Sequence, residues 1–375
     1  MASVPIHGVW EAEFNSVVEA FSENFNVQSP ILEKGAAFTV VKQGQVVVDV
    51  YGGIRNIAGD AWQQDTLVNV FSTTKGAVAL CVAHLVERGL LNYSDKIAQH
   101  WPQFAANGKQ DITLAQLLSH QGSLNAFQAP TSAEDLRNWD VCCNKLAAQA
   151  PFFTPGTTTC YHPVTFGFLV GEIVRRVTGV TIGQYLRVYI CQPQNIDFYI
   201  GLSKKNHATV ADLLTPTRPP YLPEHIPEHV LLSMINPKLR ADFMLQTQTR
   251  RAELPAVNGH GTANAIARLY DLFATRNGLL SHETVMQASK VQSTRVDELL
   301  ALPVHWGMGL VINANVNTYG PEPTTLGHSG WGGSFGCHDP VNELSMGYVC
   351  NQMSPDLVGD ARGQNLIKQV YASLV

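Results

Sequence analysis

Residues 72–89 read STTKGAVALCVAHLVERG, with hydroxyls and an amine at one end and an apolar run behind them. The apolar run predicts a helix, with Ser72 as its N-terminal cap and Gly89 as its stop signal. Ser72 and Lys75 are one helical turn apart, so their side chains share a face. At that spacing Lys75 can take the proton of Ser72 while Ser72 attacks a carbonyl carbon. The stretch therefore predicts an activated serine nucleophile.

The start of this helix favours the same chemistry. Its free amides and its dipole stabilise negative charge, such as the oxyanion that develops during acyl transfer. Apolar surroundings lower the pKa of a lysine, and a general base at neutral pH needs that shift. An isolated S-x-x-K is nevertheless more often an ordinary capped helix, so the interpretation depends on the rest of the chain.

The composition is that of an ordinary soluble globular protein. Of the 375 residues, 45% are hydrophobic and 15% are charged, and the formal net charge is -5. This balance, without a basic stripe, argues against a nucleic-acid partner. No segment approaches the ~20 apolar residues of a membrane-spanning helix. Residues 1–12 carry Pro5, Trp10 and Glu11 where a signal peptide needs an apolar stretch, so we expect a cytoplasmic protein that begins at Met1.

Seven cysteines make an odd number and include no C-x-x-C pair. Their spacing fits neither a disulfide scaffold nor a zinc site, so we expect reduced, mostly buried thiols. The chemistry predicted for Ser72 requires no metal and no organic cofactor. The cysteines are Cys81, Cys142, Cys143, Cys160, Cys191, Cys337 and Cys350.

The N-terminal part predicts a helix followed by two strands. Apolar residues over 14–25 follow helical spacing. Residues 38–41 and 46–51 flank a short polar turn and are typical of a hairpin.

The middle of the chain, from residue 72 to about 290, gives mainly helical signals. These include a capping box at 113–116 and a helix over 164–176 that Gly179 stops. Five prolines exclude a regular element from residues 215–228, and we expect this loop to shape the substrate pocket as a flap.

The period changes back to that of strands after residue 302, with strands predicted over 307–312, in pieces over 325–336, and over 344–351. A last helix is predicted near 364–374. The simplest arrangement that buries the N-terminal and the C-terminal strands joins them into one antiparallel sheet.

The predicted fold class is therefore α+β: an antiparallel sheet of N- and C-terminal strands flanked by helices, with an inserted, mainly helical lobe. We expect residues 1–71 and 300–375 to form the sheet lobe and residues 72–299 to form the helical lobe, in one compact catalytic unit.

Three separated motifs, in the same order, resemble the serine β-lactamase and penicillin-binding protein superfamily. They are Ser72-Thr73-Thr74-Lys75, Tyr161 within residues 155–179, and His328-Ser329-Gly330. The phrases at 117–120 and 167–172 resemble its class C-like branch, including the family VIII carboxylesterases. The resemblance covers nearly the whole chain and implies a β-lactamase/transpeptidase-like fold.

By this resemblance Ser72 is the nucleophile, Lys75 is the base beside it, and Tyr161 carries a proton to and from the leaving group. A phenol whose proton is loosened by a nearby ammonium suits that role. Without the other two residues, Tyr161 would be an ordinary half-buried tyrosine.

The resemblance also implies how a substrate is held. The amides of Ser72 and Trp331 would form the oxyanion hole. The substrate would lie along the strand edge formed by His328, Ser329 and Gly330, with Trp331 as a wall of the pocket.

Two residues depart from the family pattern. His328 stands where the family has a lysine, and a histidine is mostly neutral at neutral pH. Pro163, two residues after Tyr161, stands where the lactamases usually have an asparagine. Both changes weaken the β-lactamase and peptidase interpretations and favour a neutral ester as substrate.

A rival nucleophile is Ser334, because residues 332–336 satisfy G-x-S-x-G. That motif works where a strand turns sharply into a helix. Here a turn and another strand follow, so we expect a hairpin and a structural role for Ser334.

Other candidate residues have simpler explanations. His225 and His229 suggest a metal site, but Pro223 and Pro227 deny them a shared helical face, and a surface loop is expected. His120 is expected at a helix end near the cleft, in a supporting role.

An apolar pocket is suggested by Trp306, Trp331, Phe335 and Tyr221, although aromatic residues at such positions are equally often part of the core.

The expected function is that of a serine carboxylesterase that hydrolyses small, largely neutral esters through an acyl-enzyme on Ser72. Three alternatives remain: a β-lactamase or D-amino-acid amidase or peptidase, an acyltransferase, and a non-catalytic member of the fold. The intact set of Ser72, Lys75 and Tyr161 argues against the last. The partner expected is a small-molecule ester, and the sequence says nothing of oligomeric state.

Overall fold

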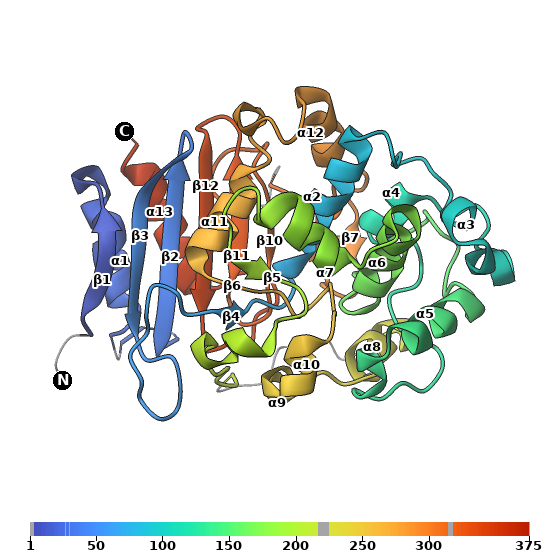
Figure 1. Cartoon of the computed structure of the whole chain (residues 1–375), viewed down its shortest axis with the longest axis horizontal. Coiled ribbons are helices and arrows are strands. Elements are labelled where there is room, and N and C mark those ends of the chain that lie inside the picture. Colours follow the sequence, from blue (N-terminus) through green and yellow to red (C-terminus); the bar gives the residue numbers. More distant parts are fainter. Residues whose placement is uncertain (1–3, 27, 30, 217–224, 314–317, 375) are drawn as a thin grey trace.

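The computed structural model describes residues 4–26, 28–29, 31–216, 225–313 and 318–374. A seven-stranded antiparallel sheet combines strands from both ends of the chain (Figure 1). The two sets meet where β2 pairs with β12. In spatial order the strands are β1 (Ile6–Trp10), β3 (Gln45–Gly53), β2 (Gly35–Lys42), β12 (Leu344–Cys350), β11 (Phe335–Asp339), β10 (Leu326–Ser329) and β9 (Val311–Ile312). This arrangement confirms the predicted fold class.

The β2–β3 hairpin turns on two residues. Gln43 and Gly44 have φ angles of 52° and 80°, and a type I′ turn requires positive φ at both central positions. Lys42 pairs with Gln45 to close the turn. The hairpin prediction is confirmed, and both strands extend beyond the predicted bounds.

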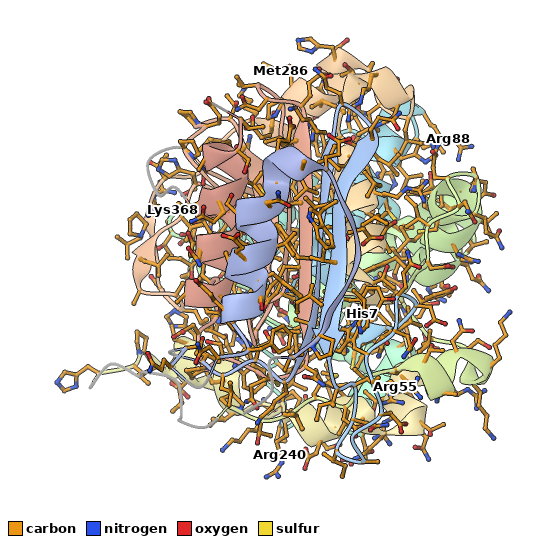
Figure 2. All side chains as sticks on the ribbon, turned by 90° about the vertical axis from the view of Figure 1, so that its left-hand side faces the viewer. His7, Arg55, Arg88, Arg240, Met286 and Lys368 are labelled. Atoms are coloured by element: carbon orange, nitrogen blue, oxygen red, sulfur yellow. The ribbon has the colours of Figure 1, made fainter. Side chains whose placement is uncertain are left out.

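Helices cover both faces of the sheet. On one face α1 (Asn15–Glu23) packs against α13 (Ala361–Ala372), and Figure 2 shows the two side by side. On the other face α11 (Ala263–Asp271) lies over β12 and β2. The approach is close, because a Cβ atom at position 347 would lie 2.3 Å from the Ala263 carbonyl oxygen, so Gly347 is required there.

The helix that carries the Ser-x-x-Lys motif, α2 (Thr74–Glu87), runs through the helical part and packs on α6 (Thr165–Thr178) and β10. Almost all of its residues are buried, as expected for a helix that is apolar all round. The other helices are α3 (Ile97–His100), α4 (Leu114–Leu118), α5 (Trp139–Ala148), α7 (Ile182–Tyr185), α8 (Glu228–Ile235), α9 (Ala241–Leu245), α10 (Thr247–Arg251) and α12 (His282–Ser289).

Two small sheets complete the framework around the start of α2. One joins β4 (Val68–Asn69), β6 (His260–Gly261) and β5 (Phe198–Tyr199), and the other joins β7 (Val296–Asp297) and β8 (Leu302–Pro303). β4 leads directly into the turn that carries Ser72.

Several predicted helix ends are confirmed. Gly89 has a φ of 66° and donates its N–H to Val86 O, which ends α2. α6 ends at Gly179, whose φ of 75° is the left-handed angle of a C-terminal cap. The capping box of Thr113 and Gln116 is present at the start of α4.

Four expectations were wrong in detail. Ser72 is not a cap, because α2 begins at Thr74, with Thr73 at the N-cap position and no side-chain cap. The chain opens with β1, an exposed edge strand, before the predicted helix. The strand predicted over 307–312 is reduced to β9, because Gly309, with a φ of 78°, turns the chain. His229 lies in the first turn of α8 and not in a surface loop.

Residues 217–224, which include most of the predicted flap and Tyr221, lie outside the described residues. In the described part of the chain, no helix is both long enough and apolar enough to cross a membrane. The two lobe boundaries stay a prediction.

Candidate active site

Ser72 lies in the turn between β4 and α2, directly after Phe71, whose backbone conformation is strained. Phe71 has a φ of 42°, a left-handed angle that is rare for a bulky residue and typical of functional turns. Phe71 O accepts a hydrogen bond from Thr74 N at 3.0 Å. Ser72 is partly exposed, whereas Phe71 and Thr73 are buried. The turn therefore presents one accessible hydroxyl on a rigid support.

Lys75 lies directly behind this hydroxyl and is fully buried. Its Nζ is 3.1 Å from Ser72 Oγ and donates to the carbonyl oxygens of Pro163 at 3.0 Å and Ala256 at 3.1 Å. A neutral amine has two N–H bonds and one lone pair. When the amine is neutral, the two carbonyls take both N–H bonds and the lone pair faces the Ser72 hydroxyl.

Burial holds the pKa of Lys75 well below its usual range. The environment therefore favours the neutral amine, the form that accepts a proton. Aromatic rings complete this environment, with Nζ 4.7 Å from the ring centroid of Tyr161 and 5.7 Å from that of Phe166.

Tyr161 is buried beside Lys75 and stacked on Trp306, with ring centroids 5.6 Å apart and planes 5° from parallel. Its hydroxyl makes no hydrogen bond of good geometry within the described residues. Burial raises the pKa of Tyr161, and the nearby Ser72 hydroxyl opposes that shift. A lowered pKa was expected from an adjacent ammonium. That expectation was wrong, because burial dominates the shift.

Asp297 fixes the stacked pair. Its Oδ1 accepts the N–H of Tyr161 at 3.0 Å, and its Oδ2 accepts the indole N–H of Trp306 at 3.3 Å. Burial raises the pKa of Asp297 to about 6, although its hydrogen bonds work in the other direction. One carboxyl thus orients both aromatic residues.

His328, on β10, presents a neutral ring. Its Nδ1 donates to Ser329 O at 2.8 Å, since a carbonyl oxygen can only accept. Nε2 is therefore the unprotonated nitrogen, and it is buried without a partner in the described part of the chain. Burial, with a smaller effect of Lys75, lowers the pKa of His328 to about 3. This position thus offers a hydrogen-bond acceptor and no positive charge.

Gly330 lets β10 approach the Ser72 turn. A Cβ atom at this position would lie 2.1 Å from Val70 O and 2.4 Å from Ser334 Oγ. Ser334 closes the same contact, because its Oγ donates to Val70 O at 3.0 Å and lies 3.1 Å from Thr73 Oγ1. The predicted hairpin context of Ser334 is confirmed by the antiparallel pairing of β10 with β11.

Trp331 follows this contact and packs edge-on against Phe71, with ring centroids 5.1 Å apart. Within the described ranges, the main-chain N–H groups of Ser72 and Trp331 donate no hydrogen bond. Both are therefore free to bind an oxyanion. The next residue is fixed, because Arg362 donates to Gly332 O at 3.0 Å.

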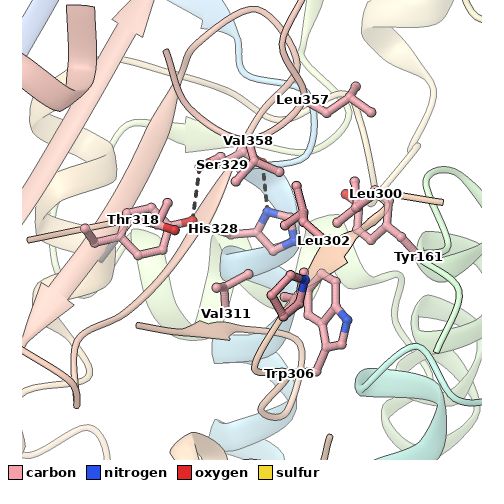
Figure 3. Close-up of a pocket in the computed structure, with 13 residues that line it drawn as sticks. Tyr161, Leu300, Leu302, Trp306, Val311, Thr318, His328, Ser329, Leu357 and Val358 are labelled. Carbon is pink, nitrogen blue, oxygen red and sulfur yellow. Dashed lines mark hydrogen bonds between the residues drawn. The ribbon is translucent and has the colours of Figure 1, made fainter. Parts of the chain in front are cut away.

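A largely apolar pocket opens beside Tyr161 and His328 (Figure 3). Its cavity volume is about 40 Å³, so in this structure it is a narrow slot, well below the volume of a typical small-molecule site. Its wall consists of Tyr161, Leu300, Leu302, Pro303, Val304, Trp306, Val311, Thr318, Tyr319, His328, Ser329, Leu357 and Val358.

Of the four aromatic residues expected at the pocket, Trp306 lines it. Phe335 does not. It packs in the core between Phe38, Tyr319 and Tyr348, because it faces the side of the sheet that α13 covers.

His120 is buried against the same aromatic group, with its ring centroid 4.8 Å from Tyr161 and 4.3 Å from Trp306. Its Nδ1 accepts the N–H of His162 at 3.2 Å. It therefore supports Tyr161 from behind.

The structure thus brings Ser72, Lys75, Tyr161, His328 and Trp331 into one place. Sequence reasoning missed the carbonyls of Pro163 and Ala256 and the carboxyl of Asp297. A main-chain oxygen carries no residue-type signal. Asp297 is 136 residues from Tyr161 and nine from Trp306, and it follows no recognisable motif.

Comparison with known proteins gives a consistent result. The family model described as Beta-lactamase matches residues 27–369. The esterase/beta-lactamase LipL of Mycobacterium tuberculosis is 30% identical over 98% of this chain and 89% of its own length.

Solved structures show the same likeness. A family VIII carboxylesterase superposes with a TM-score of 0.92 at 38% identity, covering 98% of this chain and 100% of the other. A penicillin-binding protein homologue from Caulobacter crescentus superposes with a TM-score of 0.93 at 39% identity and the same coverage. The likeness thus extends over nearly the whole chain.

Proposed function

Because this chain belongs to the beta-lactamase family and is a serine hydrolase, we propose that it is a carboxylesterase that hydrolyses small, largely neutral esters through an acyl-enzyme on Ser72. The observation that carries the chemistry is the environment of Lys75. Two carbonyls accept hydrogen bonds from its amine, burial lowers its pKa and so favours the neutral form, and its Nζ lies 3.1 Å from the Ser72 hydroxyl oxygen.

In the acylation step, Ser72 Oγ attacks the ester carbonyl carbon and its proton moves to Lys75 Nζ. The carbonyl oxygen becomes an oxyanion, and the free N–H groups of Ser72 and Trp331 would bind it. Because α2 begins beside Ser72, its dipole favours the same negative charge.

Collapse of the oxyanion breaks the bond to the alcohol oxygen. Tyr161, kept protonated by burial, donates its proton to this oxygen and recovers one from the Lys75 ammonium. In deacylation a water molecule attacks the acyl carbon, its proton passes to Lys75, and Ser72 Oγ leaves and takes that proton back. Atoms and charges balance without a cofactor.

The preference for a neutral ester is supported by His328 and by the pocket. A substrate carboxylate would meet a neutral ring with a bare acceptor nitrogen and would gain no ion pair. The pocket beside Tyr161 is walled mainly by aliphatic and aromatic groups, which suit an apolar part of an ester.

Hydrolysis of β-lactams is the second candidate, because the relative from Mycobacterium tuberculosis is called an esterase and a beta-lactamase. A β-lactam amide would use the same acyl-enzyme. It also carries a carboxylate, so the neutral His328 predicts the weaker turnover of the two.

The test measures turnover of p-nitrophenyl butyrate and of a chromogenic cephalosporin, with intact-protein mass after labelling by a fluorophosphonate. We expect ester hydrolysis, little cephalosporin opening, and label on the wild type and on Ser334→Ala but not on Ser72→Ala. Label retained by Ser72→Ala, or faster turnover of the cephalosporin than of the ester, would contradict the proposal.

We also propose a cytoplasmic location. All seven cysteines are buried and unpaired in the structure, as is usual in a reducing compartment.

A further inference from the structure

Three side chains with metal-binding atoms meet beside the segment that carries Tyr161. Sγ of Cys160, a ring nitrogen of His229 and a carboxylate oxygen of Glu298 all lie within 4.8 Å of one another. His229 and Glu298 are also in hydrogen-bond contact. We propose that this Cys-His-Glu cluster binds a divalent transition-metal ion of the zinc type.

The donor set determines the class of ion. Thiolate and imidazole ligands suit Zn²⁺ and its neighbours, whereas Mg²⁺ and Ca²⁺ prefer oxygen alone. At zinc–ligand distances of about 2.0–2.3 Å, tetrahedral ligands lie roughly 3.3–3.8 Å apart. The three ligand atoms lie within 4.8 Å of one another, so side-chain rotations must bring them closer together when the ion binds. Three protein ligands leave a fourth position for water.

The site is open on one side. Cys160 is fully buried, whereas the side chains of His229 and Glu298 are 21% and 33% exposed. The two outer ligands can therefore be reached from solvent, whereas the thiol is buried.

The main chain already holds the three ligand segments in place. Cys160 N donates to His120 O at 3.1 Å, and Glu298 N donates to Thr159 O at 3.0 Å. His229 is anchored by its carbonyl oxygen, which accepts from Asn125 Nδ2 at 2.8 Å. Because these main-chain segments are already fixed, binding an ion does not have to order them, and this favours affinity.

A nucleophilic cysteine is a weaker explanation of the cluster. Burial, followed by the charges of Asp297 and Glu298, raises the pKa of the Cys160 thiol, so the free thiol is not activated. A bound cation reverses that balance: a metal–sulfur bond forms and the thiol proton is released to solvent.

The position of the site gives the ion a structural consequence. Cys160 precedes Tyr161, and Glu298 follows Asp297, which holds the Tyr161 main chain. His229 belongs to α8, in the helical part of the molecule (Figure 1). A bound ion would therefore tie α8 to both segments that position Tyr161.

The test uses Co²⁺ as an absorbing probe on the untagged, metal-free protein. We expect one ion per chain, with a thiolate-to-cobalt charge-transfer band that Zn²⁺ displaces. Cys160→Ser should lose the band, and His229→Gln and Glu298→Gln should bind Co²⁺ at least about tenfold more weakly. Cys142→Ser, at another buried cysteine on α5, is the matched control and should keep the band.

Thermal unfolding in a chelator shows that each variant is folded, and added Zn²⁺ should raise the Tm of the wild type but not that of Cys160→Ser. Absence of the band in the wild type at saturating Co²⁺, or its survival in Cys160→Ser, would overturn the proposal. The readout does not involve ester hydrolysis, so it is independent of the proposed function.

Discussion

The close contact between Gly330 and Val70 O predicts how much the Gly330→Ala substitution lowers kcat. In Gly330→Ala the new Cβ atom would lie 2.1 Å from Val70 O, whereas such contacts are essentially never below 3.0 Å, so one segment must move by at least 0.9 Å (3.0 minus 2.1). Val70 lies two residues before Ser72, and Gly330 directly precedes Trp331. The shift therefore separates the two amides proposed as the oxyanion hole. A misplacement of about 1 Å costs roughly 10²-fold in rate, so kcat should fall about a hundredfold.

Steady-state hydrolysis of p-nitrophenyl butyrate measures kcat and KM separately, and thermal unfolding reports whether the variant is folded. Gly59→Ala is the control, because its φ of 87° makes alanine unfavourable but no atom lies within 4 Å of the added Cβ. The control should lose stability and keep kcat. A folded Gly330→Ala with kcat within about threefold of the wild type would refute the argument that this close approach positions the site.

Lys75→Met should lower kcat/KM by about 10²–10⁴-fold, the usual contribution of a general base, and unchanged steady-state rates would exclude that role. Arg362→Met should reduce the free energy of unfolding, measured in urea, by about 3–5 kcal/mol, because it leaves the buried carboxylates of Glu33 and Asp360 without their cation; a loss below about 1 kcal/mol would contradict this. For His328 the pKa is about 3 when folded and 6.5 ordinarily, so the unfolded chain binds the proton first and stability falls as pH drops below about 6.5. Between that pH and 5, His328 costs about 2 kcal/mol, and His328→Gln should show that much less loss in urea unfolding; equal losses in the two proteins would disprove the assignment.

The local features of the fold could be predicted because each has a signal in adjacent residues. The turn at Gln43 and Gly44, the capping box at Thr113 and the stop at Gly179 each depend on a few neighbouring side chains. β1 was missed because four of its five residues are exposed. A short edge strand like this lacks the buried alternation that identifies a strand.

In the candidate site, too, the features that depend on neighbouring residues could be predicted and those that depend on distant residues could not. The spacing of Ser72 and Lys75 predicted that their side chains would meet, and the distance between Nζ and Oγ is 3.1 Å. The contacts of Lys75 with the carbonyls of Pro163 and Ala256 had no such signal, because no sequence pattern marks a main-chain oxygen. The Cys160 cluster was equally invisible, because its ligands are separated along the chain and share no spacing rule.

Because β2 pairs with β12, the central sheet cannot be completed until long after β2 has been synthesised. Lys42 pairs with Leu344 and Ala36 with Cys350, so the first hairpin leaves the ribosome about three hundred residues before its partner strand. During that time β2 presents an unpaired edge, a template for wrong association. The helices of the middle segment can form early, but the sheet that supports them is completed only after β12 has been synthesised. Loss of the last thirty residues would therefore leave an incomplete sheet, however well the Ser72 turn itself were formed.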